Sequence, residues 1–237
     1  MSNALHENAQ DRLPDLLILA GRAGPACGDD SPPPQIFAPW LDRLPAAQRD
    51  LVSILPVLDI NGALFDALGS ASETTAPRET CAAPQIAALL CVDPFLRLRD
   101  ATRLLKSAGI SAVTNFPTVQ LVDGTAARGF ESAGLGVERE AEILRQFMLE
   151  GFSVTGFATS TENAQRLLAL GIRDLVIHPG PPSSDWRNRA TAGQKAVAAL
   201  STLRSRAPGP LRLFCPEAYG HEFDAARAAA DGLVRYG

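Results

Sequence analysis

The sequence predicts an α/β protein built as a TIM (β/α)8-type barrel. Short apolar, β-branched segments alternate with amphipathic segments along most of the chain, a pattern typical of parallel strands joined by right-handed crossovers. The length of 237 residues suits one such barrel, which commonly needs about 200–250 residues. Polar residues follow directly on several apolar segments, where α/β barrels place their ligands. We therefore expect one domain over residues 1–237, with a loose segment at 1–14.

The predicted strands are short apolar runs that end at proline, glycine or a polar residue. We expect about seven, one fewer than the eight that close a barrel: 15–20, 86–92, 110–116, 152–157, 174–177, 211–214 and 232–236. Gly, Pro and Ser are frequent in 21–34 and 70–84, which predicts long loops there. An open, doubly wound sheet is the alternative, although no G-x-G-x-x-G motif follows the first strand.

Helical segments are expected between the strands because apolar residues recur there every three or four positions. The expected helices cover 63–68, 96–108, 137–150, 160–170, 194–205 and 223–230. Glycine follows several of them as a stop signal. Ser160 is expected to cap the helix that follows it, and Asp59 the helix that begins near residue 63.

Charge and composition count against two classes of partner. The formal net charge is −4 and aromatic residues make up 6%, so neither a basic surface nor stacking platforms support nucleic-acid binding. No apolar run approaches the roughly 20 residues of a membrane span. Residues 1–12 are polar and lack the apolar core of a secretory signal. We therefore expect a cytoplasmic protein whose partner is a small molecule.

The four cysteines are scattered along the chain, at Cys27, Cys81, Cys91 and Cys215. They form no C-x-x-C pair and have no zinc-ligand spacing. Cys91 and Cys215 follow predicted strands and would line a pocket there, but a small buried hydrophobic residue is the simpler interpretation.

The segment 111–124 is the centre of the predicted site. It begins as a buried strand, breaks at Pro117, which cannot donate to a sheet ladder, and carries Asn115, Thr118 and then Asp123-Gly124 beyond the strand. A strand followed by a proline-containing turn is the structural alternative. Polar residues at comparable strand ends are Arg22, Asp59, Asn61, Asp93, His178 and Glu217.

These residue types suggest specific chemistry. Asp93 and Asp59 are candidate ligands for Mg²⁺, which takes one or two carboxylates together with substrate oxygens and water; loop or helix-cap roles are the alternative. His178 is a candidate general acid or base, or a structural histidine. Arg22 is a candidate for holding a carboxylate or phosphate, or a surface residue. No G-x-S-x-G motif supports a Ser-His-Asp triad.

The chain resembles the phosphoenolpyruvate hydrolase-like family, TIM-barrel proteins also described as indole-glycerol-phosphate-synthase-like or as signal-transduction barrels. The motifs that carry this resemblance are Asp93-Pro94-Phe95, Asn115-Phe116-Pro117-Thr118, Asp123-Gly124, Glu131, Gly134-Leu135-Gly136, Glu138 and His178-Pro179-Gly180. Weaker similarity reaches Arg22 and Asp59-x-Asn61. The resemblance implies a site that includes His178, Asp93 and Asn115 as catalytic residues. Substrate contacts are expected from Arg22, Asn61, Thr118, Asp123, Gly124 and Gly180.

The departures from the family pattern are also informative. The family's first strand has no counterpart, so 15–20 aligns with its second strand, and the barrel is expected to be irregular, open or closed by a partner chain. An exposed edge would favour a homo-oligomer. The family's C-H-G-G is Cys215-Pro216-Glu217-Ala218 here, and an aromatic residue is replaced by Val137.

Two functions are consistent with these observations. The first is a hydrolase or lyase that acts on a small anionic 2-oxo acid or enol phosphate, such as phosphoenolpyruvate or phosphonopyruvate, with Mg²⁺ at Asp93 and Asp59. In that interpretation His178 moves a proton. The second is a non-catalytic barrel that senses a metabolite or docks a partner, which the loss of C-H-G-G favours.

Overall fold

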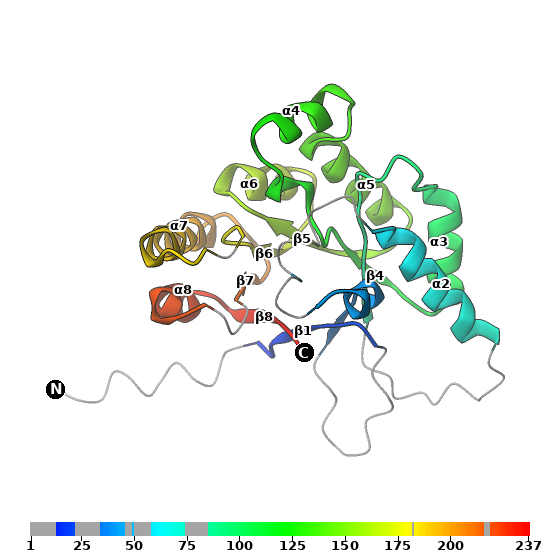
Figure 1. Ribbon diagram of the computed structural model, residues 1–237, viewed down its shortest axis with the longest axis horizontal. Helices are drawn as coiled ribbons and strands as arrows, with labels where there is room; N and C mark the ends of the chain where they lie inside the picture. Colours follow the sequence, from blue (N-terminus) through cyan, green and yellow to red (C-terminus); the bar gives the residue numbers. More distant parts are fainter. Residues whose placement is uncertain are drawn as a thin grey trace, which may run out of the picture.

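Eight parallel strands close into a barrel within one chain. The computed structural model describes residues 13–21, 34–45, 49, 58–73, 85–181, 183–215 and 219–237. The strands pair in sequence order, and β1 pairs with β8 to close the sheet. They are β1 (Leu16–Leu19), β2 (Gln35–Phe37), β3 (Gln85–Ala88), β4 (Ala112–Thr114), β5 (Ser153–Ala158), β6 (Asp174–Ile177), β7 (Leu211–Phe214) and β8 (Gly232–Tyr236). The helices surround this sheet (Figure 1), so the predicted TIM-barrel class is confirmed.

The strand missing from the sequence prediction is β2. Its three residues directly follow the segment 21–34, which glycine and proline marked as a loop, and a strand so short shows no alternation of apolar and polar residues. Ile36 lies opposite Ile18 of β1 and Ile86 of β3. The run at 15–20 is thus the first strand of the barrel. Because β2 completes the ring, the exposed edge that favoured a homo-oligomer is absent from the described sheet.

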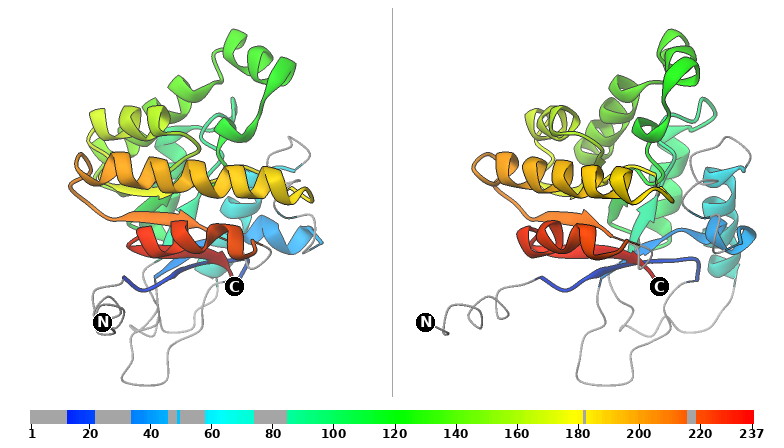
Figure 2. Two further views of the ribbon diagram at one scale, coloured as in Figure 1. Left: turned by 90° about the vertical axis from the view of Figure 1, so that its left-hand side faces the viewer. Right: turned by 60° about the vertical axis from the view of Figure 1, so that its left-hand side comes forward.

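The α-helices follow the strands as expected, with three differences. They are α2 (Ile60–Glu73), α3 (Leu98–Ser107), α4 (Gly124–Ser132), α5 (Val137–Leu149), α6 (Thr161–Ala169), α7 (Trp186–Arg204) and α8 (Asp224–Ala229), with 3-10 helices η1 (Pro39–Arg43), η3 (Val119–Leu121) and η4 (His221–Phe223). Helix α2 continues past Gly69, α7 begins before residue 194, and α4 was not predicted. No residue of α4 is buried and Phe130 is its one large apolar residue, so the sequence gives little apolar pattern there. The helix stands away from the other helices (Figure 2).

Aromatic side chains fill the barrel at the carboxyl ends of its strands. The same interior cluster contains aliphatic residues that include Leu16, Ile18, Ile36, Ile86, Val176 and Val234. Phe116 stacks on Trp40 with ring centroids 5.7 Å apart and contacts Phe157 at 5.1 Å and Phe214 at 6.0 Å. All four rings are at most 1% exposed. Space for a ligand therefore lies off the barrel axis, among the loops.

The expectation for two of the cysteines is confirmed. Cys91 and Cys215 are buried and not disulfide-bonded, as expected of small hydrophobic residues, whereas Cys27 and Cys81 lie outside the described residues. None of the described helices combines the length and apolar content that crossing a membrane requires.

The closure by β2 gives a stability prediction. Ile36 is fully buried between two neighbouring strands, so the change Ile36→Ala should lower the free energy of unfolding by about 2–5 kcal/mol, because it leaves a cavity. The control Ile36→Val should cost only about 0.5–1.5 kcal/mol. Urea unfolding followed by circular dichroism measures both. Equal stability of the two variants would show that β2 does not belong to the core.

Candidate functional site

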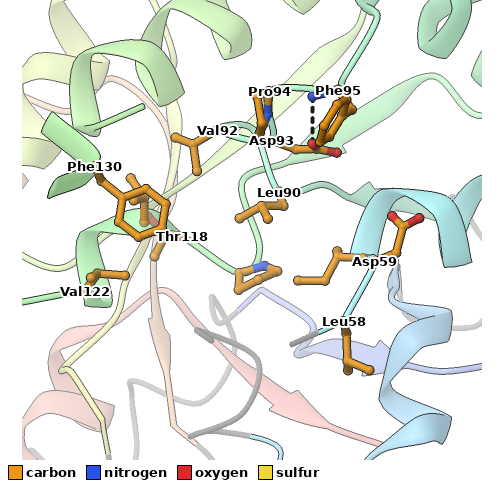
Figure 3. Close-up of a pocket in the computed structure, with 13 residues that line it drawn as sticks. Leu58, Asp59, Leu90, Val92, Asp93, Pro94, Phe95, Thr118, Val122 and Phe130 are labelled. Carbon is orange, nitrogen blue, oxygen red and sulfur yellow. Dashed lines mark hydrogen bonds between the residues drawn. The ribbon is translucent and has the colours of Figure 1, made fainter. Parts of the chain in front are cut away.

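A cavity of about 410 Å³ opens at the carboxyl-terminal rim of the barrel. It lies between the loops that follow β2, β3 and β4, and we call it the Asp93 cavity. Its lining is mostly apolar and comprises Leu58, Asp59, Ile60, Leu90, Val92, Asp93, Pro94, Phe95, Pro117, Thr118, Val119, Val122 and Phe130 (Figure 3). Phe130 comes from α4, so this protruding helix forms one side of the cavity. The volume suits a small metabolite.

Asp93 is held in a fixed orientation at the end of the loop that follows β3. Its Oδ2 accepts a hydrogen bond from Nδ2 of Asn61 at 2.9 Å, and its Oδ1 accepts one from the backbone N–H of Phe95 at 2.8 Å. Asn61 also exchanges two hydrogen bonds of 3.0 Å with the backbone of Leu90. Asn61 is 2% exposed and does not line the cavity. It therefore positions the Asp93 loop and offers no free group to a substrate.

Asp59 serves both as a helix cap and as part of the cavity wall. Its Oδ1 accepts a hydrogen bond from the N–H of Gly62 at 2.7 Å, which satisfies a free donor at the start of α2. The expected cap is thus confirmed. Figure 3 shows the carboxylates of Asp59 and Asp93 on the same side of the cavity, with Phe130 on the other side.

The carboxylates of the Asp93 cavity fit a magnesium ion that takes most of its oxygen ligands from water and from a bound substrate. Two carboxylates line the cavity, and Mg²⁺ typically binds through one or two carboxylates and substrate oxygens. Within the described residues, no three His, Cys, Asp or Glu side chains form a metal-binding group. No Lys, Arg or His is among the described lining residues, and Arg22 lies outside the described residues. A bound cation would therefore be needed to attract an anion to the described walls.

Asn115 is a buried structural residue in this arrangement. Its Nδ2 donates to Oε1 of Glu140 at 2.8 Å and to the carbonyl of Phe157 at 3.0 Å, and its Oδ1 accepts from the N–H of Phe157 at 2.7 Å. The side chain is 0% exposed and all its polar atoms have protein partners. Asn115 thus joins β4 to β5 and has no free group for a substrate.

Glu140 of α5 is the centre of this polar network. Its Oε1 accepts hydrogen bonds from Asn115 at 2.8 Å, from Oγ1 of Thr118 at 2.6 Å and from Nε2 of Gln120 at 2.8 Å. Its Oε2 accepts the N–H of Val119 at 2.9 Å. Burial raises the pKa of Glu140, and these four donors oppose the rise by stabilising the carboxylate. The side chain is 1% exposed.

Sequence reasoning missed Glu140, although the pattern contained a signal. Glu140 lies one turn before Leu144 and beside Ala141, on the face of α5 that packs against the barrel. A carboxylate on an apolar helix face is rarely buried unless it is paired. That position therefore indicated that Glu140 has polar partners, and the structure identifies them in the loop after β4.

His178 lines a different cavity from Asp93. It follows β6, is 4% exposed, and its ring stacks on Phe214 with centroids 4.4 Å apart. Burial lowers its pKa to about 3, so the imidazole is neutral near pH 7. Nδ1 accepts a hydrogen bond from the N–H of Gly180 at 3.1 Å, which assigns the proton to Nε2. His178 is therefore a hydrogen-bond donor, and it does not line the Asp93 cavity.

The remaining predicted residues are placed as follows. Thr118 lines the Asp93 cavity with its hydroxyl donated to Glu140. Asp123 and Gly124 are exposed at the start of α4, next to the lining residue Val122. Gly180, with a φ of 99°, forms the turn after β6, and its N–H donates a hydrogen bond to Nδ1 of His178. Arg22 and Glu217 lie outside the described residues.

The predicted site residues thus share one rim of the barrel but do not converge on one cavity. Asp93, Asn115 and His178 follow β3, β4 and β6 respectively, at the same end of the sheet. Asp93 and Asp59 line the Asp93 cavity, Asn115 lies inside the wall, and His178 lines a second cavity beyond that wall.

Comparisons with known proteins identify the class. The sequence matches the model of the phosphoenolpyruvate hydrolase-like family over residues 46–207, and the chain belongs to this family. It is 30% identical over 166 residues to the uncharacterized protein y4oT of Sinorhizobium fredii, covering 69% of this chain and 80% of that protein.

Two further similarities were found. The chain is 29% identical over 147 residues to the tomato (Solanum lycopersicum) ToMV resistance protein Tm-1, covering 62% of this chain and 19% of that protein; it thus spans about a fifth of its tomato relative. Among solved structures, it resembles a "putative phosphonomutase" from Burkholderia cenocepacia J2315 with a TM-score of 0.44 and 14% identity, covering 86% of this chain and 78% of that one.

The Glu140 network gives a second stability prediction. The change Glu140→Gln should lower the free energy of unfolding by about 3 kcal/mol or more, because the new amide N–H groups face donors and leave buried groups unpaired. Glu142→Gln is the matched control on the same helix, where Glu142 forms a surface pair with Arg145, and little change is expected. Chemical denaturation measures both variants. Equal losses would contradict a central role for Glu140.

Burial of His178 predicts a specific pH dependence of stability. Its pKa in the folded protein, about 3, lies below the ordinary value near 6.5, so the unfolded chain binds the extra proton between these values. The free energy of unfolding should therefore fall as pH drops below about 6.5, by up to about 1.4 kcal/mol per unit.

Removing the imidazole should flatten this dependence. His178→Phe, which keeps a ring against Phe214, is expected to lose the slope between pH 6.5 and 5, measured by denaturation at each pH. The matched change His221→Phe, at an exposed histidine, should retain it. An unchanged slope in His178→Phe would assign the titration to another group.

Proposed function

We propose that this protein is an enzyme that binds a small anionic 2-oxo acid or enol phosphate, such as phosphonopyruvate or phosphoenolpyruvate, in the Asp93 cavity and cleaves it as a hydrolase or lyase. The observation that supports this most is the position of Asp93. It is a carboxylate fixed by two hydrogen bonds in the wall of a cavity at the rim where TIM barrels carry their active sites. The model of the phosphoenolpyruvate hydrolase-like family matches residues 46–207, and this range includes every described lining residue of that cavity.

A divalent cation, held by Asp93 and Asp59, is part of this proposal. When bound, such an ion would neutralise charge on a carboxylate or enolate oxygen. Asn61 and the N–H of Phe95 orient Asp93, so its unused lone pairs stay directed without reorganisation of the loop. Apolar side chains surround it, and a ligand that displaced water from the cavity would experience stronger electrostatic interactions.

The alternative is a non-catalytic barrel that binds a metabolite. The apolar character of the Asp93 cavity favours this function, because ten of its thirteen described lining residues carry apolar side chains. No described histidine reaches the cavity to transfer a proton. A binding protein would need the cavity but neither the carboxylates nor the metal.

Metal-dependent binding and turnover distinguish the two functions. Wild-type protein should be stabilised by phosphonopyruvate or phosphoenolpyruvate only when Mg²⁺ is present, by about 2.7 kcal/mol at a ligand concentration 100 times Kd. Thermal-shift measurements with Mg²⁺ and with EDTA test this, together with assays of phosphate and pyruvate release.

The change Asp93→Asn should abolish both the metal-dependent stabilisation and turnover. The matched control Asp100→Asn removes an exposed carboxylate of α3 that pairs with Arg103, and it should retain both. Equal stabilisation with and without Mg²⁺, in the absence of turnover, would refute the enzyme and support the binding protein.

A further inference from the structure

The carboxylates of the Asp93 cavity are confined to one of its sides, and the opposite side is apolar. Figure 3 shows Val122 and Phe130 across the cavity from the carboxylates of Asp59 and Asp93. The volume of about 410 Å³ lies in the range of about 300–1,000 Å³ typical of pockets that enclose drug-sized ligands. A three-carbon acid bound at the carboxylates would leave much of this space to water against apolar side chains, which is unfavourable.

The third polar residue of the described lining, Thr118, offers no free group to a ligand. Its hydroxyl donates to Oε1 of Glu140 at 2.6 Å and accepts the N–H of Gln120 at 3.3 Å. Among the described lining residues, the side-chain oxygens that remain for a ligand therefore belong to Asp59 and Asp93. A ligand anchored there through a metal ion meets apolar side chains with the rest of its structure.

Phe130 is the most distinctive residue of the apolar side, because it comes from a helix that contributes nothing to the core. No residue of α4 is buried, and Phe130 is the one large apolar residue of this helix. It lines the cavity and is only partly buried. A ligand in the cavity would cover more of its apolar surface, which favours binding in proportion to the area removed from water.

The end of α4 that carries Phe130 is held against the start of α5. The Oε1 atom of Glu131 accepts the N–H of Val137 at 3.3 Å, and the N–H of Leu135 donates to the carbonyl of Phe130 at 2.9 Å. Gly136 leaves room for this contact, since a Cβ at its position would overlap the Glu131 carboxylate. The Glu131 to Gly136 motif thus fixes the end of α4 and, with it, the place of Phe130 at the cavity.

We propose that the substrate of the Asp93 cavity is a 2-oxo acid with an apolar group, about the size of a phenyl ring, on the carbon next to the oxo group, and that Phe130 determines this specificity. The inference rests on the proposed function, which places the oxo acid at the two carboxylates and their metal ion. The apolar group then lies against Val122 and Phe130, where a ring gains both burial and an aromatic contact. Phe130 acts on binding and takes no part in the chemistry.

Isothermal titration with phenylpyruvate and with pyruvate, both in the presence of Mg²⁺, tests this specificity. The two acids share the same 2-oxo carboxylate, so the ratio of their affinities measures the apolar contact. Wild-type protein should bind phenylpyruvate at least about tenfold more tightly than pyruvate. Phe130→Ala should remove most of this preference by weakening phenylpyruvate and leaving pyruvate unchanged, whereas Phe130→Leu should keep part of it.

Leu149→Ala is the matched control for the loss of an apolar side chain. Leu149 is an exposed residue of α5 that does not line the cavity, so this variant should retain the wild-type preference. Phe130 is likewise outside the core, so Phe130→Ala should fold, and circular dichroism of all variants checks this.

The outcomes separate this inference from the proposed function. Phenylpyruvate that binds no more tightly than pyruvate, or an equal preference in wild type and Phe130→Ala, would refute the specificity. Phosphoenolpyruvate that binds only with Mg²⁺ in the same experiments would then leave the proposed function standing. If none of the three acids shows binding that depends on Mg²⁺, the proposed function is wrong and this inference is wrong with it.

Discussion

The structure of the functional rim depends on one buried carboxylate. Glu140 brings together the tip of β4, helix η3 and helix α5, because three side chains and one backbone N–H donate to its two oxygens. A charge taken out of water is costly unless donors surround it. The loop after β4 therefore has one arrangement in which this carboxylate is satisfied. That arrangement places Thr118 in the wall of the Asp93 cavity.

The same network separates the two cavities. Gln120 donates to Glu140 and to the carbonyl of Phe157, and its Oε1 accepts the N–H of Thr159 at 3.0 Å. Thr118 lines the Asp93 cavity, whereas Thr159 lines the second cavity, which lies between α6 and α7. Because hydrogen-bonded side chains and the aromatic cluster around Phe116 fill the space between them, a ligand in one cavity does not contact the walls of the other. The rim thus holds two separate cavities, and of their described lining residues only those of the Asp93 cavity include carboxylates.

This division changes the role expected of His178. A histidine at a strand end is a common acid or base, but burial against Phe214 lowers its pKa to about 3, and the turn at Gly180 fixes its tautomer. A neutral ring with its proton on Nε2 can donate a hydrogen bond, but it does not take up a proton near pH 7. The enzymatic proposal therefore rests on Asp93 and Asp59, without this imidazole.

The sequence by itself determined the barrel class, the positions of most strands and helices and the end of the barrel that carries polar residues, because these follow from local periodicity and from stop signals such as Gly151 and Pro117. It did not show β2 or α4, since three residues are too few for a pattern and α4 has only one large apolar residue, Phe130. Only the tertiary structure decided which polar residues meet. Asn61 and Asn115 bind side chains and backbone that are 25 to 42 residues away in the chain, and Asp93 and His178 line different cavities. Such distant pairings are set by packing, which no local pattern records.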